Sequence, residues 1–316
     1  MTALGGACLL VGCEGVQSTF SPFGAEAESI RTLTLLMVAA AALITVGVLW
    51  LAWHAVRAPE GRLDHAGGMR VIFWLGGVGP TLLLTVLLAS SLPRMRTLPT
   101  DAGDLEIAVD GEQFWWRVRY RPPGGEAVET ANEIRVPVGR TVRLAVESPD
   151  VIHSFWIPGL AGKIDAIPGR TNDLVVRATQ AGTYRGVCAE FCGLSHARMA
   201  FDVVAMEPAA FDGWLEELAS PASGAPGAGG RLFEEYGCEG CHSVRGHFPG
   251  SPIGPDLTHF GARLSLAAGT LPMTVDAIGR FIRDPSAFKP GVPMPAFRDM
   301  PPEDAESIAV YLSELQ

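Results

Sequence analysis

Two uninterrupted apolar runs limit the folds open to this chain of 316 residues more than any other feature. The first run covers residues 33–56 and has no charge between Thr32 and Trp53, and the second, residues 71–92, is uncharged throughout. An α-helix needs about 20 apolar residues to cross the hydrocarbon core of a bilayer. Inside a bilayer a helix satisfies its own backbone polar groups, which no water can bind. We therefore expect two transmembrane helices within residues 26–98, in preference to two buried helices of a soluble protein.

The arginines that flank these runs predict how the chain crosses the membrane. Arg57, Arg62 and Arg70 lie in the short connection between the runs. Basic residues in short loops favour the cytoplasmic side. Arg94 and Arg96, which follow the second run, favour the opposite orientation more weakly. We therefore predict a multi-pass protein of the bacterial inner membrane, with its remaining domains on the periplasmic or extracellular side.

The first 25 residues form a separate N-terminal segment. Leu10-Val-Gly-Cys13 is similar to a lipobox, in which a signal peptidase cuts before a Cys that becomes lipid-modified. Cys13 is therefore a lipidation candidate. Residues 1–12 contain no Lys or Arg and are short for a signal. The alternatives are an accidental match or a start further upstream.

The segment Cys188-Ala-Glu-Phe-Cys192-Gly-Leu-Ser-His196-Ala-Arg-Met199 gathers side chains that bind soft metal ions, and His153 adds an upstream imidazole. Thiolates can bridge two metal ions, imidazole suits copper, and a weak axial Met tunes the potential. The pattern therefore predicts a copper pair. A tetrahedral Cys2His2 zinc site is one alternative, which leaves Met199 without a role. A Cys188–Cys192 disulfide is a second, possible in an oxidising compartment.

Short segments rich in β-branched and aromatic residues fill residues 102–207, with Pro and Gly between them. Regularly spaced strands of this kind are typical of a β-sandwich or barrel. A sandwich can present ligands from distant strands at one end, which suits His153 and the two cysteines. The predicted strands are 105–109, 114–120, 133–136, 141–147, 153–157, 172–177, 182–187 and 200–204.

Residues 208–230 predict a short helix followed by a flexible linker, because residues 220–230 are mainly Gly, Ala, Pro and Ser. Residues 231–316 then form a small domain of their own. Within it, Cys238-Glu-Gly-Cys241-His242 is typical of c-type haem attachment, with two thioethers and an axial His. A CxxC pair without the His would equally indicate a redox or zinc motif.

The residues around the predicted copper site resemble cytochrome c oxidase subunit II over residues 15–207. The resemblance is carried by Asp150-Val-Ile-His153-Ser-Phe-Trp-Ile-Pro158, by Lys163-Ile-Asp-Ala-Ile-Pro-Gly-Arg170 and by the Cys188–Met199 segment. It implies a cupredoxin fold with a binuclear CuA centre. The implied ligands are Cys188 and Cys192 as bridges, His153 and His196 on one copper each, and Met199 and the Glu190 carbonyl as weak axial ligands.

In that family the carboxylate at the Glu190 position also reaches a magnesium ion at the interface with subunit I. Oxygen ligands suit magnesium, so one Glu is reasonable there. The alternative is that Glu190 is an exposed acid on a loop.

The stretch Gln113-Phe114-Trp115-Trp116 differs from the pattern of the family. An aromatic residue directly after this Gln receives electrons from the external donor and is commonly Trp, whereas here it is Phe114. We expect electron transfer to involve Phe114, Trp115 or Trp116, with a direct path from haem to copper. The alternative is that aromatic residues in a strand simply pack the sheet.

The second axial haem ligand is a choice among Met273, Met294 and Met300. Val292-Pro-Met294-Pro-Ala-Phe297 resembles the methionine loop of class I cytochromes c, which favours Met294. A His–Met pair raises the haem potential, as a carrier that feeds copper requires. His247 and His259 leave a bis-His haem as the alternative. The resemblance also predicts a closing helix at residues 301–315, in which Tyr311 contacts Phe233.

Together the resemblances imply a membrane-anchored multidomain protein, with a two-helix transmembrane hairpin, a cupredoxin-like β-sandwich and a small all-α cytochrome c domain. They are those of subunit II of a caa-type, proton-pumping haem–copper oxidase. Electrons would pass from a donor to haem c, then to CuA, then to subunit I, where oxygen is reduced on another chain. The donor would be a soluble or membrane cytochrome c or a bc-type complex.

Two further functions stay open at the level of sequence. One is a CuA-bearing subunit of a nitric oxide reductase, and the other is a non-catalytic copper carrier or redox sensor. The net charge of −10 excludes a general nucleic-acid binder and would attract a basic partner.

Overall fold

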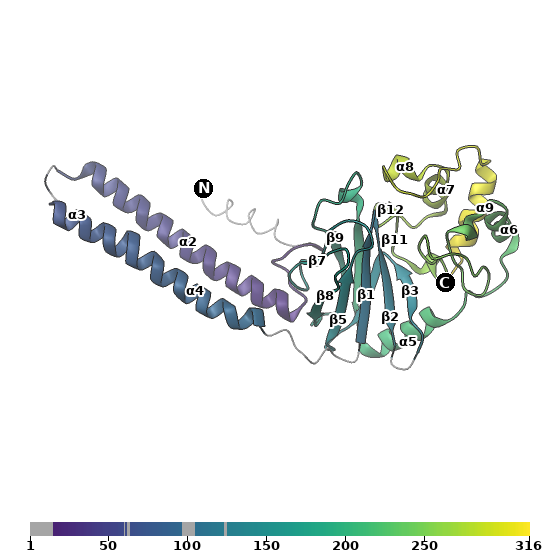
Figure 1. Ribbon diagram of the computed structural model, residues 1–316, viewed down its shortest axis with the longest axis horizontal. Coiled ribbons are helices and arrows are strands. Elements are labelled where there is room, and N and C mark those ends of the chain that lie inside the picture. The colour runs from purple at the N-terminus through teal and green to yellow at the C-terminus, as the bar shows by residue number, and fades with distance from the viewer. Residues whose placement is uncertain (1–14, 60, 62–63, 97–104, 123–124) are drawn as a thin grey trace, which may run out of the picture. The chain divides into compact units, whose positions relative to one another are not determined.

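The computed structural model describes residues 15–59, 61, 64–96, 105–122 and 125–316 (Figure 1). The chain divides into two compact units, residues 32–101 and the remainder. The lipidation candidate Cys13 lies outside the described residues.

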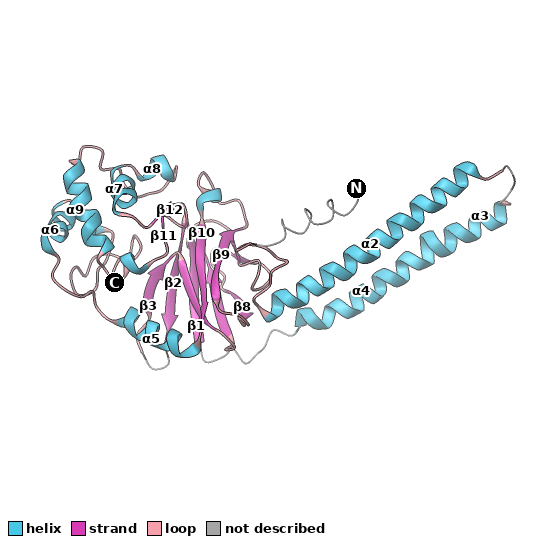
Figure 2. Ribbon diagram, turned by 180° about the vertical axis from the view of Figure 1, so that it is seen from behind, coloured by secondary structure: helices cyan, strands magenta, loops and turns pink. Residues whose placement is uncertain are grey.

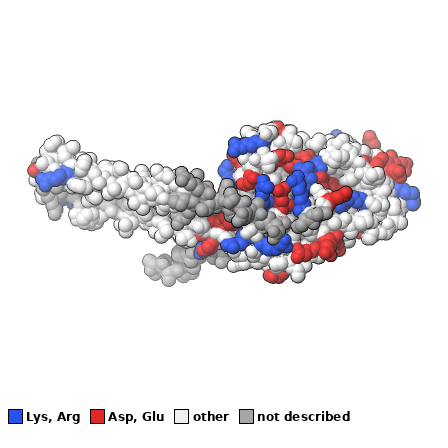
Figure 3. Space-filling view, turned by 60° about the horizontal axis from the view of Figure 1, so that its bottom comes forward, with Lys and Arg blue, Asp and Glu red and all other residues white. Residues whose placement is uncertain are grey.

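The first unit consists of two long apolar helices. Helix α2 spans Ala25–Arg57, and α3 (His65–Val71), the π-helical turn η1 (Ile72–Val78) and α4 (Gly79–Arg96) follow one another without a break. The segments Ala25–Arg57 and His65–Leu92 are long and apolar enough to cross a membrane. Their apolar side chains are exposed, as in Leu43 at 77%, and this unit is nearly free of charge between its ends in Figure 3. Lipid is the solvent that suits such a surface.

The π-helical turn has a local cause in the sequence. Pro80 has no N–H to donate to the carbonyl four residues before it. Gly79 donates instead to the Trp74 carbonyl, five residues back. The second helix therefore continues through its proline by widening one turn.

The second unit contains a β-sandwich of two five-stranded sheets, with the orders β3-β2-β1-β5-β8 and β4-β10-β9-β6-β7. Figure 2 shows the strands with helix α5 at one end. The strands are β1 Leu105–Glu112, β2 Trp115–Arg121, β3 Val128–Ala131, β4 Glu133–Pro137, β5 Val142–Glu147, β6 His153–Trp156, β7 Ile164–Ala166, β8 Asn172–Val176, β9 Gly182–Cys188 and β10 Ala200–Met206.

The core between the sheets consists of the apolar side chains that the strands direct inward. Trp116, Phe155 and Phe201 are fully buried and meet ring to ring, with centroids 5.4 Å apart for Trp116 and Phe155 and 4.7 Å apart for Phe155 and Phe201. The sequence prediction missed β3 and β7. Both are short edge strands with polar residues, and backbone pairing with a neighbour holds them in place.

A small helical domain follows the sandwich. Helix α5 (Pro208–Ala219) packs on the sandwich. The helical domain has α6 Gly227–Glu235, α7 Val275–Arg283, α8 Pro285–Phe288 and α9 Pro302–Ser313, with a small hairpin of β11 Ser265–Leu266 and β12 Leu271–Pro272. Helix α6 begins at Gly227, inside the predicted linker. A Cβ at Gly229 would lie 2.2 Å from the Ser307 carbonyl oxygen, so glycine lets α6 cross α9 closely. The predicted Phe233–Tyr311 contact is present, with ring centroids 6.0 Å apart.

Candidate metal centre and haem site

The candidate copper ligands come together at one end of the sandwich. His153 begins β6, Cys188 ends β9, and Cys192 to Met199 form the loop that leads into β10. Phe155 of β6 pairs with Cys188 of β9, so the two neighbouring strands bring His153 and Cys188 to the same end. The pairing of the strands therefore unites residues that are distant in the sequence.

The distances between ligand atoms fit a pair of metal ions with shared thiolates. Cys188 Sγ lies 3.9 Å from His153 Nδ1, and Cys192 Sγ lies 3.7 Å from His196 Nδ1. The two Sγ atoms are 3.8 Å apart. Two ligands of one tetrahedral metal ion are about 3.6 Å apart at ordinary metal–sulfur and metal–nitrogen lengths. Each imidazole thus accompanies its own thiol, and the two thiols lie between them.

The two weak axial ligands expected from the resemblance also lie at this site. Met199 Sδ is 3.8 Å from Cys192 Sγ, and the Glu190 carbonyl oxygen is 3.2 Å from Cys188 Sγ. The Glu190 side chain is exposed on the same loop. All six expected donors are therefore in one place.

The two thiols are better suited to binding a metal cation than to losing both protons without one. A hydrogen bond from the Cys192 thiol lowers the pKa of Cys188 to about 3, and the His153 ring adds to the effect. The same neighbour raises the pKa of Cys192, because a second thiolate would lie beside the first. One thiolate therefore forms readily, and the second needs the positive charge of a bound metal.

Asp150 orients the first imidazole. Its carboxylate oxygen accepts a hydrogen bond of 2.8 Å from His153 Nε2, which leaves Nδ1 facing Cys188. Asp150 is itself held by the backbone N–H of Gln113 at 2.7 Å. A carboxylate behind a ligating His is a common device for fixing the tautomer and the ring. The sequence motif contained Asp150, but gave no reason to assign it this role.

The alternatives to a copper pair fit the geometry less well. In the described part of the chain the four cysteines are free, and the 3.8 Å separation of Cys188 and Cys192 exceeds a disulfide bond. A single tetrahedral zinc would need four donors around one point. The group whose ligand atoms all lie within 4.8 Å of one another holds His153, Cys188 and Cys192, and leaves His196 out.

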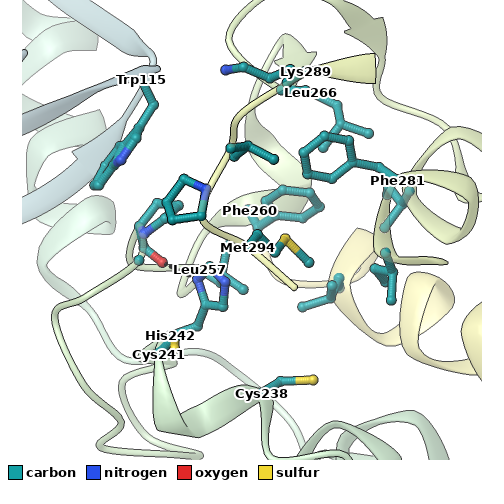
Figure 4. A pocket seen from close by; sticks show the side chains of 18 of the residues that line it. Trp115, Cys238, Cys241, His242, Leu257, Phe260, Leu266, Phe281, Lys289 and Met294 are labelled. Carbon is teal, nitrogen blue, oxygen red and sulfur yellow. Dashed lines mark hydrogen bonds between the residues drawn. The ribbon is translucent and has the colours of Figure 1, made fainter. Parts of the chain in front are cut away.

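The candidate haem site is a largely apolar cavity in the helical domain (Figure 4). Cys238, Cys241 and His242 line it from one side, and Met294 lines it from the methionine loop. His242 Nδ1 donates to the Pro255 carbonyl at 2.8 Å, which leaves Nε2 free for an axial bond. Burial lowers the pKa of His242, so the ring is held in the neutral form that binds iron. The donor set therefore suits a covalently bound haem.

The other residues considered as axial ligands lie elsewhere. Met294 lines the cavity, whereas Met300 is buried in the core and Met273 packs beside it. His247 binds the Tyr311 hydroxyl and the Gly224 carbonyl. His259 binds the Ser220 carbonyl.

The three aromatic residues of the Gln113 stretch divide between the two sites. Trp115 lines the haem cavity (Figure 4). Trp116 lies edge-on to His153 with centroids 6.0 Å apart, and its indole N–H donates to the Met199 carbonyl at 3.4 Å. Phe114 is buried, and its carbonyl accepts a bond from Lys289. Lys289 is a residue of the haem cavity that the sequence alone gave no signal to find.

Comparison with known proteins matches both domains. The family described as cytochrome c oxidase subunit II, periplasmic domain, matches residues 118–206, and the cytochrome c family matches residues 227–316. Cytochrome c oxidase subunit 2 of Alkalihalophilus pseudofirmus is 33% identical over 97% of this chain and 94% of its own length. The same subunit of Bacillus subtilis is 32% identical over 67% of this chain and 62% of its own.

Among solved structures, the periplasmic domain of subunit II of cytochrome oxidase from Bradyrhizobium japonicum is 34% identical to the matched part. The match covers 37% of this chain and 94% of that domain, with a TM-score of 0.35.

Proposed function

This chain belongs to the cytochrome c oxidase subunit II family and carries a cytochrome c domain, and we propose which residues pass electrons through it. It is a subunit of cytochrome c oxidase that transfers electrons to the oxidase. The predicted fold class is confirmed: two long apolar helices, a cupredoxin-like sandwich in the periplasm and a helical cytochrome c domain.

One observation carries the proposal. Trp115 and Trp116 are neighbours on β2, and their side chains reach two different candidate sites. Trp115 lines the haem cavity, and Trp116 packs on the His153 ring. We propose that electrons pass between the two sites at this pair, with Phe114 as a packing residue beside it.

At the copper site, Cys188 and Cys192 would bridge two copper ions. His153 and His196 would bind one ion each, and Met199 with the Glu190 carbonyl would be weak ligands. When bound, the copper pair and haem c supply one-electron redox chemistry. Asp150 holds the His153 ring, and the buried Met199 and Cys192 keep water from the site.

At the haem site, Cys238 and Cys241 would form the thioether bonds. His242 would be one axial ligand, held in place by the Pro255 carbonyl, and Met294 the other. The partly buried position of Met294 on the cavity wall supports this choice over Met273 and Met300.

We also propose that the exposed Glu190 carboxylate contributes to a magnesium site shared with subunit I. Its support is its place on the loop between the two bridging cysteines. Replacing magnesium by paramagnetic manganese in the complex tests it. The manganese signal should change in Glu190→Ala and stay unchanged in a Glu147→Ala control, and an equal signal in both would refute the role.

The experiment that tests the main proposal uses the purified oxidase complex. Metal analysis should give two coppers and one haem c per copy of this chain, and paramagnetic resonance should show one unpaired electron shared by two coppers. Injecting an electron into haem c by a flash should then be followed by reduction of the copper pair. A mononuclear copper signal, or zinc alone, would refute the copper assignment and favour a copper carrier.

We propose the class of electron donor from its redox chemistry alone: a soluble or membrane cytochrome c, or a bc-type complex. Oxygen consumption tested against nitric oxide consumption by the same complex separates an oxidase from a nitric oxide reductase.

A further inference from the structure

Three hydrogen bonds join one short segment of the cytochrome domain to the sandwich, two at the loop of the candidate copper ligands and one at the turn between β1 and β2. The Ser195 hydroxyl donates to the Pro290 carbonyl at 2.8 Å, and the Arg198 guanidinium donates to the Phe288 carbonyl. In the opposite direction, the Lys289 ammonium donates to the Phe114 carbonyl. We call Ser195, Arg198 and Lys289, with the carbonyl groups that they bind, the latch.

Two of the three latch side chains are buried away from water. Ser195 and Lys289 are 1% and 3% exposed. Among the described residues Lys289 makes no ion pair with a carboxylate. Its ammonium donates to the Phe114 carbonyl across the interface instead. Burial lowers the pKa of Lys289 to about 7, as expected for an amine removed from water. These two side chains are therefore part of a packed interface, unlike the poorly packed and wet contacts of crystal lattices.

Three further contacts lie on other parts of the interface. On one side, the Arg117 guanidinium donates to the Pro252 carbonyl at 2.8 Å. Near the small hairpin, the backbone N–H of Leu264 donates to the buried Glu133 at 2.9 Å. Arg185 binds the Gly269 carbonyl at 2.7 Å. Three separate stretches of the cytochrome domain are therefore tied to the sandwich, which fixes its orientation as well as its position.

The segment between the two domains is bound too. The carbonyl groups of Ser220 and Gly224 accept hydrogen bonds of 3.0 Å from His259 and His247. The backbone N–H of Ala222 donates to the Arg245 carbonyl at 2.8 Å. A free linker would leave its backbone groups to water, whereas Ser220, Ala222 and Gly224 of this segment are paired with the domain that they lead into.

The latch also joins the two redox sites. Ser195 directly precedes His196, the candidate copper ligand, and Lys289 lies on the same loop as Met294, the candidate haem ligand. Lys289 lines the haem cavity as well (Figure 4). The latch therefore holds the ligand loop of one site against the ligand loop of the other.

From these contacts we propose that Lys289, Ser195 and Arg198 keep the cytochrome domain docked on the sandwich throughout turnover. Electrons then cross a fixed junction, and residues 220–226 serve as a tether that does not swing. The proposal rests on the proposed function only for the two redox sites that the junction separates.

A disulfide beside the latch tests this directly. A Cβ built at Gly291 lies 3.6 Å from the Leu194 Cβ, a separation that suits a disulfide. Leu194→Cys with Gly291→Cys should close in the oxidised oxidase complex, and electron transfer from haem c to the copper pair should keep the rate of the parent. Because φ at Gly291 is +81°, Gly291→Cys alone is the control for backbone strain. A pair that fails to close, or that closes and slows transfer below the single variants, overturns the proposal.

A variant that removes one hydrogen bond of the latch provides the complementary test. Lys289→Met keeps the apolar stem and removes the donor, and we expect transfer from haem c to copper to slow by about tenfold, as for the loss of one buried hydrogen bond. The engineered disulfide should restore the rate in the same chain. Lys163→Met, at the other lysine of the chain, is the matched control. An unchanged rate in Lys289→Met, or a slow rate that the disulfide does not restore, contradicts the role of the latch.

Copper content, haem content and both spectra are measured first in every variant. Their loss would count against the proposed function. A change in transfer rate with intact spectra concerns docking alone.

Discussion

Asp150 is the residue whose removal most sharply tests how the copper site is organised. Asp150→Ala removes the carboxylate that accepts the 2.8 Å hydrogen bond from His153 Nε2. The ring is fully buried, whereas the Asp150 side chain is 32% exposed, so water that takes the place of the carboxylate is a neutral acceptor with no fixed position. The imidazole then has no anchored acceptor to fix its tautomer and to keep Nδ1 facing Cys188.

Loss of the carboxylate behind a ligating His typically lowers metal affinity by about 10–100-fold. This corresponds to about 1.4–2.8 kcal/mol. We expect the loss to fall on the copper ion that His153 binds. Asp150 also accepts the Gln113 N–H, so part of the effect will come from that strand turn.

The assay is competition for copper with a chelator of known affinity, followed by the absorption and paramagnetic signals of the copper pair in the purified complex. Asp165→Ala is the control, because that carboxylate binds Ser154 and Lys163 and touches no candidate ligand ring. Copper affinity in Asp150→Ala within about twofold of the control would refute the orienting role, since the expected loss is at least about tenfold.

Three further predictions concern the candidate ligands and the loop that carries Met294. Cys188→Ser should abolish the copper pair, because one thiolate cannot bridge both ions in this geometry; two coppers per chain by metal analysis would contradict this. Met294→Ala should keep the covalent haem and lower its reduction potential, since a His–Met pair raises it, and an unchanged potential would show that another residue is the ligand. Asp284 stabilises the loop through Arg298, whose hydrogen bond at 3.0 Å lowers the pKa of Asp284 from 3.8 to about 2. Because this pKa is lowered, the stabilisation of the loop by the Asp284–Arg298 ion pair is present above about pH 4 and is lost as the pH falls to about 2. Methionine ligation followed by haem absorption should therefore be weaker in Asp284→Asn than in the parent at neutral pH, with the difference disappearing in acid. A constant difference across the titration would refute the role of the ion pair.

The elements with a strong local signal were predictable from the sequence. The two uncharged runs had the length of membrane helices, and the long apolar helices of the structure contain both. The cysteine, histidine and methionine spacings placed the candidate ligands, because one loop and two paired strands bring them together. These features depend on local pattern or on a motif.

The parts that the sequence did not predict depend on contacts between distant residues. The edge strands β3 and β7 have little apolar pattern and exist because a neighbouring strand pairs with them. The Gly-rich segment predicts a flexible linker, yet its glycines allow α6 to begin early against α9. The burial of Lys289 could not be predicted from the sequence, since a lone lysine in a loop is usually exposed to water. Only the position of Phe114 across the interface gives Lys289 a partner.

The placement of Trp115 and Trp116 on consecutive positions of β2 has a geometric consequence. Successive residues of a strand point to opposite faces, so a single layer of backbone separates the haem cavity from the candidate copper site. One strand is the thinnest layer that a polypeptide can place between two sites. The pleat of β2, and not the length of any loop, sets the distance between them. Insertions in the surrounding turns would leave this spacing intact, whereas a slip of β2 by one residue would exchange the two indoles.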